Sequence, residues 1–593
     1  MVWNFFNRGI MMRQKHIKDI FFIGVFILGV IFLRIFYITR TTGPFIYADE
    51  FGYWSHAAHL AGYVWAGAMD GVSWYSFGYS LWLALTFLFS NQMVVMYRIA
   101  IGINILMCLG IYGLTYGIVT RLTKEQNTFT CGLIAFAATS FPTYIFYSYT
   151  TMCETLLALV VWLLFYELVS LEENPVWWKG LLLGMTAGYA YMVHNRMLTA
   201  LLAVAICLTV LWLTNRIDWK MIVSFAVAVL AVLFFYIFLK EFLENMIANN
   251  RIFAETQTTI VRGKANTFGK IWKNFLFIFT LKNIIRPILS LMGQLWQCLS
   301  ATYLLAGLGT VYVVRGLKKS FEGRQSICMY AYPFFSVLFS VGLTSVVALG
   351  PKLGVTGRIR IDSAFYGRYN ECYYALLIMM ALVLLCERKW GNTLRICLGV
   401  IAVYLALSMG MLVRLSGVDE GYLNIVSSVG IHIFHWLGDF SVFRCTVIAL
   451  LGGVGIWGLC SLRKMGRLGY YAGLFLLVFL FSTTALYCMR ASIRGENDYT
   501  KQYVPLYDYL NENTVKGEVV YTTAENKPVF DLQTRLVDKP VVAVPAGHLN
   551  TLKEEAYVVV RNEQMEEIPV KEYDVCLECE ELIVLKWKGC TME

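Results

Sequence analysis

The chain has 593 residues, of which 58% are hydrophobic and only 15% are charged. One soluble core could not bury so much apolar surface, so the composition excludes a soluble globular enzyme. The formal net charge of +10 comes from scattered rather than striped basic residues, which argues against nucleic acid as a partner. Short basic loops on the cytoplasmic side of a membrane protein produce such a charge.

Apolar runs longer than about 18 residues, enough to cross a bilayer, recur from residue 19 to residue 489. The first run follows a basic head, is too long for a signal peptide and lacks a small-residue cleavage site, so we interpret it as a retained helix. The predicted spans are 19–38, 97–120, 129–147, 155–170, 177–193, 197–214, 221–239, 291–314, 326–349, 372–386, 394–413, 443–461 and 468–488. The predicted fold class is therefore an all-α polytopic membrane protein of about thirteen helices.

Loop charges predict which ends of these spans face the cytoplasm. With the N-terminus inside, basic residues such as Arg121, Arg216 and Lys318 lie in short inner loops. The polar sequence then falls outside, in segments 39–76, 240–290, 350–371 and 414–442 and in the tail. This predicts a transmembrane domain at 1–490 and an extracytoplasmic C-terminal domain at 491–593.

The tail is predicted to be a small α/β unit. Short apolar or β-branched runs predict strands at 518–522, 540–544, 557–560 and 582–587, with a helix at 503–511. No catalytic constellation is evident there. Cys576, Cys579 and Cys590 are interpreted as a disulfide or as idle thiols rather than a zinc site, because paired ligand clusters are missing.

Directly beyond the first span the sequence reads Gly-Pro-Phe-Ile-Tyr-Ala-Asp-Glu-Phe-Gly-Tyr-Trp-Ser-His, with the acidic pair at Asp49 and Glu50. An Asp-Glu pair at this place, followed by an aromatic-rich stretch, resembles the GT-C superfamily of membrane glycosyltransferases. That superfamily includes protein O-mannosyltransferases and lipid A aminoarabinose transferases. The motifs that recur in the same order are Ser76-Phe77-Gly78-Tyr79-Ser80, Thr150-Thr151-Met152-Cys153-Glu154-Thr155, His194-Asn195-Arg196 and Tyr366-Gly367-Arg368-Tyr369-Asn370-Glu371. The resemblance implies a polyprenyl-phosphate sugar as donor.

Inverting glycosyl transfer needs a base that takes the proton of the acceptor hydroxyl. Asp49, at the outer boundary of the membrane, is the candidate catalytic base, and Glu50 is the candidate that orients it or the acceptor. The alternative for Asp49 is a carboxylate that caps the following helix. For Glu50 the alternative is a solvated or cap-supporting residue.

The leaving polyprenyl phosphate gains negative charge, which preorganised guanidinium groups stabilise. Arg368 is the first candidate ligand of the donor phosphate, and Arg196, Arg358 and Arg360 are further candidates. The alternative is that these arginines pair with lipid headgroups at the membrane interface.

Further residues are predicted around the substrate. Glu154, His194 and Tyr369 are candidate substrate-binding residues, with structural pairing as the alternative for Glu154. His56 and His59 share one helical face and are weak candidates for a divalent metal ion. The alternative is that both are histidines of the membrane interface that bind no metal. Metal dependence stays open.

The sequence thus predicts an inverting hexosyl- or pentosyltransferase that moves a sugar from a polyprenyl-phosphate donor to an unknown glycan, lipid or protein acceptor. The predicted place is the outer face of a plasma membrane, and the absence of an Asn-x-Ser/Thr sequon favours a bacterial one. The alternative is a transporter or flippase of a lipid-linked glycan. Against it stand the missing internal repeat and charges that gather at helix ends.

Overall fold

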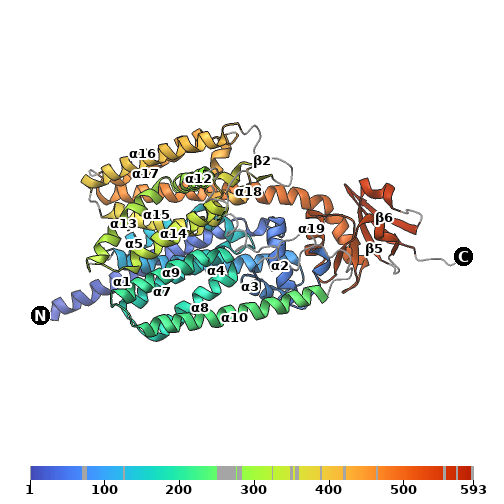
Figure 1. Cartoon of the computed structure of the whole chain (residues 1–593), viewed down its shortest axis with the longest axis horizontal. Coiled ribbons are helices and arrows are strands. Elements are labelled where there is room, and N and C mark those ends of the chain that lie inside the picture. Colours follow the sequence, from blue (N-terminus) through green and yellow to red (C-terminus); the bar gives the residue numbers. More distant parts are fainter. Residues whose placement is uncertain are drawn as a thin grey trace.

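The computed structural model shows a long helical bundle with a small sheet at one end (Figure 1). The structure describes residues 2–588 except 70–75, 124–126, 250–275, 277–283, 324, 348–351, 354–358, 388–389, 418–422, 438, 463–464, 552–555 and 569–571. The predicted outer segments 240–290, 350–371 and 414–442 therefore lie partly outside the described residues.

The bundle carries the predicted spans. Its helices are α1 (Val2–Ile35), α4 (Met93–Leu122), α5 (Thr128–Thr139), α6 (Pro142–Phe146), α7 (Glu154–Glu173), α8 (Trp177–Val193), α9 (Leu198–Leu213), α10 (Trp219–Asn249), α12 (Ile285–Ala301), α13 (Leu305–Phe321), α14 (Cys328–Val347), α15 (Glu371–Cys386), α16 (Trp390–Leu415), α17 (Val442–Ser461) and α18 (Gly466–Asn513). In the described part of the chain, nine helices are long and apolar enough to cross a membrane, or eleven if each of two bent pairs counts as one span. Eleven of the thirteen predicted ranges fall on these helices or pairs. The ranges 177–193 and 372–386 fall on α8 and α15, which have 17 and 16 residues and are not among them. The chain is a multi-pass membrane protein.

The two bent pairs have local causes. α5 and α6 meet at 76°, where Pro142 at the start of α6 cannot donate a backbone hydrogen bond. α12 and α13 meet at 104°, where Tyr303 and Leu304 adopt left-handed backbone angles (φ 49° and 63°). Both breaks therefore follow from the backbone chemistry of two or three residues.

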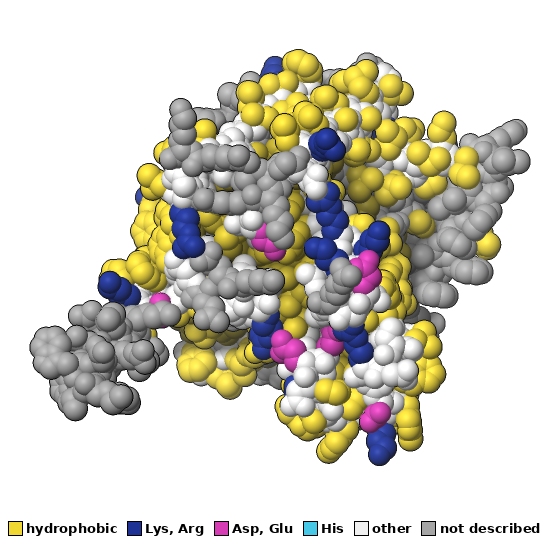
Figure 2. All heavy atoms as spheres, turned by 90° about the vertical axis from the view of Figure 1, so that its left-hand side faces the viewer, with side chains coloured by type: hydrophobic (Ala, Val, Ile, Leu, Met, Phe, Trp, Pro, Cys, Tyr) yellow, Lys and Arg dark blue, Asp and Glu magenta, His cyan; other side chains and the backbone are white. Residues whose placement is uncertain are grey.

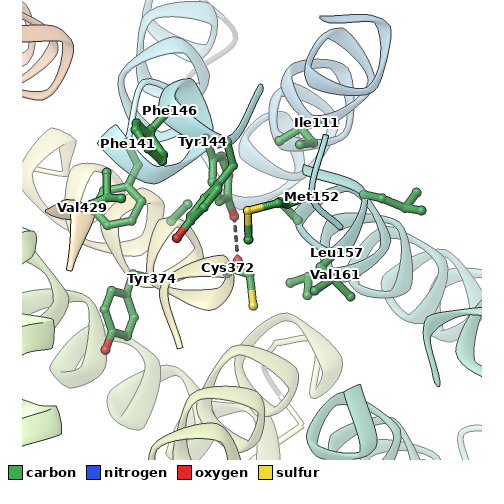
Figure 3. Packing of buried hydrophobic residues seen from close by; sticks show 14 of the residues in the cluster. Ile111, Phe141, Tyr144, Phe146, Met152, Leu157, Val161, Cys372, Tyr374 and Val429 are labelled. Atoms are coloured by element: carbon green, nitrogen blue, oxygen red, sulfur yellow. Dashed lines mark hydrogen bonds between the residues drawn. The ribbon is translucent and has the colours of Figure 1, made fainter. Parts of the chain in front are cut away.

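The bundle core is densely aromatic where α6, α7 and α15 meet (Figure 3). Tyr144 on α6 donates its hydroxyl to the carbonyl of Cys372 on α15 at 2.6 Å and accepts from Trp162 Nε1 on α7 at 3.2 Å. These bonds satisfy buried polar groups that lipid could not. They also fix the middle of α7 and the start of α15 relative to each other.

The C-terminal unit is a five-stranded mixed sheet with strand order β4-β3-β5-β7-β6. Its strands are β3 (Val520–Thr522), β4 (Val541–Ala543), β5 (Tyr557–Arg561), β6 (Tyr573–Cys579) and β7 (Leu582–Trp587). β3 pairs in parallel with β4 and β5, whereas β7 is antiparallel to β5 and β6. Four strands were predicted from the sequence; β6 was not, because its exposed and half-buried side chains do not form an apolar run.

The helix expected at 503–511 is not a separate element. It is the last part of α18, which continues unbroken for 48 residues from the membrane into the C-terminal unit. Pro505 lies inside this helix without ending it. The predicted domain boundary at residue 490 falls in the middle of α18.

The sheet is docked on the loop that follows the first span. α2 (Tyr47–Leu60) lies between the bundle and the sheet (Figure 1). Trp65 Nε1 donates to the carbonyl of Val537 at 2.9 Å, and the ring of Phe51 on α2 stacks on Phe530 with centroids 4.7 Å apart. Phe530 belongs to α19 (Lys527–Arg535), and one apolar core runs from the bundle into this helix and one face of the sheet. The C-terminal unit therefore holds α2 in place.

Basic side chains gather at the end of the bundle opposite to the sheet (Figure 2). Arg216 there pairs with Glu172 at the end of α7 and donates to the backbone at the end of α13. Glu172 also accepts the amides of Ile327 and Cys328, which begin α14. The ends of four helices are thus tied together on this basic face.

Candidate active site

Two acidic and two basic side chains meet at the sheet end of the bundle. Arg368 donates from one guanidinium nitrogen to Asp49 and, from Nε, to Glu154 Oε1 at 2.7 Å. Glu154 Oε1 also accepts from Arg196 at 3.1 Å. We call Asp49, Glu154, Arg196 and Arg368 the ionic cluster. These four residues are far apart in the chain, and each was named from the sequence.

Each member of the ionic cluster stands at the start of a helix. Asp49 is in the first turn of α2 and Glu154 is the first residue of α7. Arg196 and Arg368 occupy short 3-10 turns directly before α9 and α15. Helix N-termini carry partial positive charge, which adds to that of the two guanidinium groups. The cluster therefore lies where the N-terminal ends of several helices favour an anion.

The ionic cluster is buried, but one member reaches solvent. The side chains of Glu154, Arg196 and Arg368 are 4%, 8% and 9% exposed, whereas that of Asp49 is 27% exposed. Burial opposes the charge of Arg368, but Glu154 and Asp49 outweigh it and hold the Arg368 pKa well above its ordinary value. Both arginines stay charged, and Asp49 is the carboxylate that an incoming molecule can reach.

His194 and Tyr369 lie beside the cluster, and their predicted contact with substrate stays a prediction. The guanidinium of Arg196 lies 5.5 Å from the centre of the Tyr369 ring. The backbone amide of Arg196 donates to His194 Nδ1 at 3.1 Å. Burial and the charges of Arg196 and Arg368 lower the pKa of His194 well below its ordinary value. The imidazole is therefore neutral and adds no third positive charge.

Glu50 does not face the ionic cluster. It is fully buried, and its two oxygens accept five hydrogen bonds. One oxygen binds the amides of Phe45 and Ile46 before α2, and the other binds Tyr97 and both the amide and the hydroxyl of Thr151. Because both oxygens are saturated, Glu50 anchors the start of α2 directly beside Asp49. The predicted role of Glu50 in orienting Asp49 or the acceptor stays a prediction.

The remaining predicted arginines differ from Arg368 and Arg196. Arg360 lies on β2 (Ile359–Arg360) and is paired with the fully buried Asp362, which also accepts from Ser427. The Arg360 guanidinium thus has an internal carboxylate partner and lies 5.8 Å from the centre of the Tyr366 ring. Its predicted contact with the donor phosphate stays a prediction. Arg358 lies outside the described residues.

The metal candidates His56 and His59 are both buried on α2. His59 Nδ1 lies 2.7 Å from the carbonyl of Ser55, and burial lowers the pKa of both histidines, that of His56 to about 3. The described residues contain no group of three His, Cys, Asp or Glu side chains that could hold a metal.

Two buried carboxylates near the site were not singled out from the sequence. Glu371, within the quoted Tyr366–Glu371 motif, is fully buried and accepts from Thr143, Gln297 and the amide of Gly430. It holds the segment after Arg368 against α6 and α12. Asp362 was missed although its spacing of two from Arg360 is a signal for a local ion pair.

Comparisons with known proteins bear on this arrangement. The structure of ArnT from Cupriavidus metallidurans in the apo state matches with a TM-score of 0.51 and 12% identity, over 95% of this chain and 97% of that chain. The structure of the same protein bound to undecaprenyl phosphate matches with a TM-score of 0.50, 12% identity and the same coverage. The apo oligosaccharyltransferase of Archaeoglobus fulgidus gives a TM-score of 0.44 at 12% identity, over 92% of this chain and 70% of that chain.

No protein-family model and no curated protein matches the sequence. The likeness to ArnT extends over nearly the whole of both chains, from the first span to the C-terminal sheet. The chain therefore has the fold of the GT-C glycosyltransferases, as its sequence motifs predicted.

Proposed function

We propose that this protein is an inverting glycosyltransferase that takes a sugar from a polyprenyl-phosphate donor and passes it to an envelope acceptor at the outer face of the membrane. The observation that carries the proposal is the ionic cluster, in which the candidate base Asp49 touches the candidate phosphate ligand Arg368. The solved complex of ArnT, which has the same fold, contains undecaprenyl phosphate. This supports a polyprenyl phosphate as the lipid carrier.

The charges of the ionic cluster explain how a donor binds. Asp49 and Glu154 balance Arg196 and Arg368, so the resting cluster is neutral. A donor phosphate brings one negative charge and competes with Asp49 for the exposed side of Arg368. Binding thus places the phosphate on the guanidinium and releases the Asp49 carboxylate toward the acceptor. Glu154, which contacts both arginines, acts as a positioning residue.

Transfer then needs one proton and one electron pair to move. The acceptor oxygen attacks the anomeric carbon from the face opposite to the phosphate, while its proton passes to Asp49. The bond between the anomeric carbon and the phosphate oxygen breaks, and the electron pair stays on the polyprenyl phosphate. Arg368 and Arg196 stabilise the charge that develops there. Attack opposite to the leaving group inverts the anomeric centre.

The basic face in Figure 2 supports the orientation. Lys and Arg in short loops favour the cytoplasmic side. The sheet end, with the ionic cluster and residues 491–593, then faces out, where donors carried on lipid are presented. A bacterial plasma membrane is the proposed setting, with the acceptor a glycan, a lipid or a protein.

The test is transfer by the purified full-length chain in lipid, supplied with radiolabelled polyprenyl-phosphate sugars and envelope extracts. Asp49→Asn is expected to lower the transfer rate by about 10²- to 10⁴-fold, the usual contribution of a general base. The matched control is Asp508→Asn, an exposed carboxylate of α18 away from the cluster, which should leave the rate unchanged. Movement of lipid-linked sugar across the bilayer without transfer, undiminished in Asp49→Asn, would instead establish a flippase.

A further inference from the structure

A basic site, separate from the ionic cluster, lies where α1 and α18 leave the bundle at the sheet end. It is a pocket of about 230 Å³ lined by Arg40, Arg490, Arg494 and Lys501. A single carboxylate, Asp498, also lines it. The lining thus carries a net charge of about +3 from groups that are charged at neutral pH.

The sequence of α18 builds this pocket on one helical face. Arg490, Arg494, Asn497 and Lys501 are spaced by four, three and four residues, which brings their side chains into one row. Arg40 faces the row from the last turn after α1, and the carbonyl of Arg40 accepts from Asn497 Nδ2 at 3.2 Å. The pocket therefore has walls from two helices that are distant in the sequence.

The protein itself leaves most of this charge uncompensated. Arg494 lies 3.6 Å from Asp498, but Arg40, Arg490 and Lys501 pair with no carboxylate in the described part of the chain. None of these basic residues belongs to the ionic cluster. Like charges held together in one pocket repel each other unless an anion joins them.

The position of the pocket relative to the membrane indicates the kind of anion that it binds. Arg490 is the first charged residue of α18 after the uncharged stretch 468–489, and Arg40 ends the first candidate span. Both therefore stand where their helices emerge from the hydrocarbon layer, at the depth of lipid headgroups. Basic pockets between transmembrane helices at this depth suit phosphate-bearing headgroups, and arginine offers paired donors to phosphate oxygens.

We propose that the pocket between Arg40 and the α18 face of Arg490, Arg494 and Lys501 binds the phosphate headgroup of an anionic membrane lipid. The site is separate from the donor site and does not depend on the transferase assignment. Its occupant would also brace the segment before α2, because Thr42 donates to Asn497 Oδ1 at 3.2 Å beside the pocket.

Native mass spectrometry of the detergent-purified full chain tests the proposal with three probes: dioctanoyl phosphatidylglycerol, zwitterionic dioctanoyl phosphatidylcholine and inorganic phosphate. The wild type should retain phosphatidylglycerol in preference to the other two. The variant is Arg490→Gln/Arg494→Gln/Lys501→Gln. It should lose affinity on the order of 100-fold, taking about 1 kcal/mol for each basic residue near a headgroup.

The matched control is Lys516→Gln/Arg561→Gln/Lys588→Gln, which removes the same charge from the surface of the C-terminal unit and should bind as the wild type does. Asp498→Asn, which removes the carboxylate from the pocket, should tighten binding, a gain that misfolding cannot mimic. Equal phosphatidylglycerol binding by the pocket variant and the wild type would overturn the proposal. So would a pocket that holds inorganic phosphate as tightly as the lipid.

Discussion

At the scale of single residues, Arg368 is the hub of the candidate site because its two donor edges hold two different carboxylates. A planar guanidinium can make both contacts, whereas an ammonium group is one compact point charge. Asp49 alone among the cluster carboxylates is partly exposed. The hub therefore links the reachable carboxylate to the buried pair of Glu154 and Arg196.

Arg368→Lys is the residue-scale prediction that follows. The lysine keeps the positive charge but cannot donate to Asp49 and Glu154 from two edges as the guanidinium does. The transfer rate should therefore fall by about 10²- to 10³-fold, as when one preorganised donor is removed from a reacting site. Rates of transfer from a radiolabelled donor measure this. Arg121→Lys, whose partner Glu173 is at the opposite end of α7 from the cluster residue Glu154, is the control and should retain most of the rate. Equal losses in both variants would contradict the assignment.

Glu50→Gln tests whether Glu50 is structural. A glutamine offers one acceptor oxygen and presents an NH₂ group to donors, so at least one of the five hydrogen bonds is replaced by a clash of donors. The free energy of unfolding should drop by about 2 kcal/mol or more, seen as a lower melting temperature in detergent.

The control for Glu50→Gln is Glu167→Gln. Glu167 is also a buried glutamate, but its carboxylate accepts one hydrogen bond, from Thr186 at 3.0 Å. A neutral amide can keep that bond and removes a buried charge, so this variant should melt no lower than the wild type. A larger loss at Glu167 than at Glu50 would argue against the anchoring role.

The sequence was sufficient to name the residues of the ionic cluster but not to predict which of them contact each other. Asp49, Glu154, Arg196 and Arg368 stand in short motifs at helix ends, where a charged residue is conspicuous beside apolar sequence. Which carboxylate faces the cluster depends on the direction of α2, because adjacent residues on a helix point about 100° apart. That direction is set by Tyr97 and Thr151, partners that no local pattern reveals.

At the scale of elements, α2 is held between the bundle and the C-terminal unit. Glu50 ties its first turn to α4 and to the segment before α7, and Phe51 stacks on Phe530 of α19. Since Asp49 lies one residue before Glu50 and two before Phe51 in the first turn of α2, the position of the candidate base depends on both attachments. The small C-terminal unit thereby acts on the site without contributing a side chain to the ionic cluster.

Phe530→Ala tests this dependence. Phe530 is 4% exposed, so removal of its ring should cost about 3–5 kcal/mol of packing, lower the transfer rate and expose the C-terminal unit to protease. Limited proteolysis and the transfer assay report on the two effects. Val515→Ala, at a side chain that is 71% exposed in the same unit, should change neither. Full activity in Phe530→Ala with a protease-sensitive C-terminal unit would show that docking does not position α2.

At the scale of the whole molecule, hydrophobic runs predicted every candidate span in the described part of the chain, because the bilayer demands long apolar helices. Three features could not be predicted in this way. The bends at Pro142 and Tyr303 depend on local backbone geometry. The continuation of α18 into the C-terminal unit depends on Pro505, which the helix tolerates. Strand β6 has no apolar run that would reveal it.

The orientation of the molecule is open to a direct experiment. In a chain with Cys576, Cys579 and Cys590 changed to Ser, a membrane-impermeant maleimide applied to intact cells should label Lys516→Cys in the C-terminal unit. It should label Lys318→Cys, at the basic end of α13, only after the cells are permeabilised. The reverse labelling pattern would place the ionic cluster on the cytoplasmic side.

The central claim is that Asp49 and Arg368 work as one site, and a double-mutant cycle on the transfer rate tests it most directly. Rates are measured for the wild type, Asp49→Asn, Arg368→Gln and the double variant. Because groups that act as a unit are strongly non-additive, the double variant should be about as slow as the slower single variant. If the two losses instead multiply, the two side chains act independently, and the account of a shared site is contradicted.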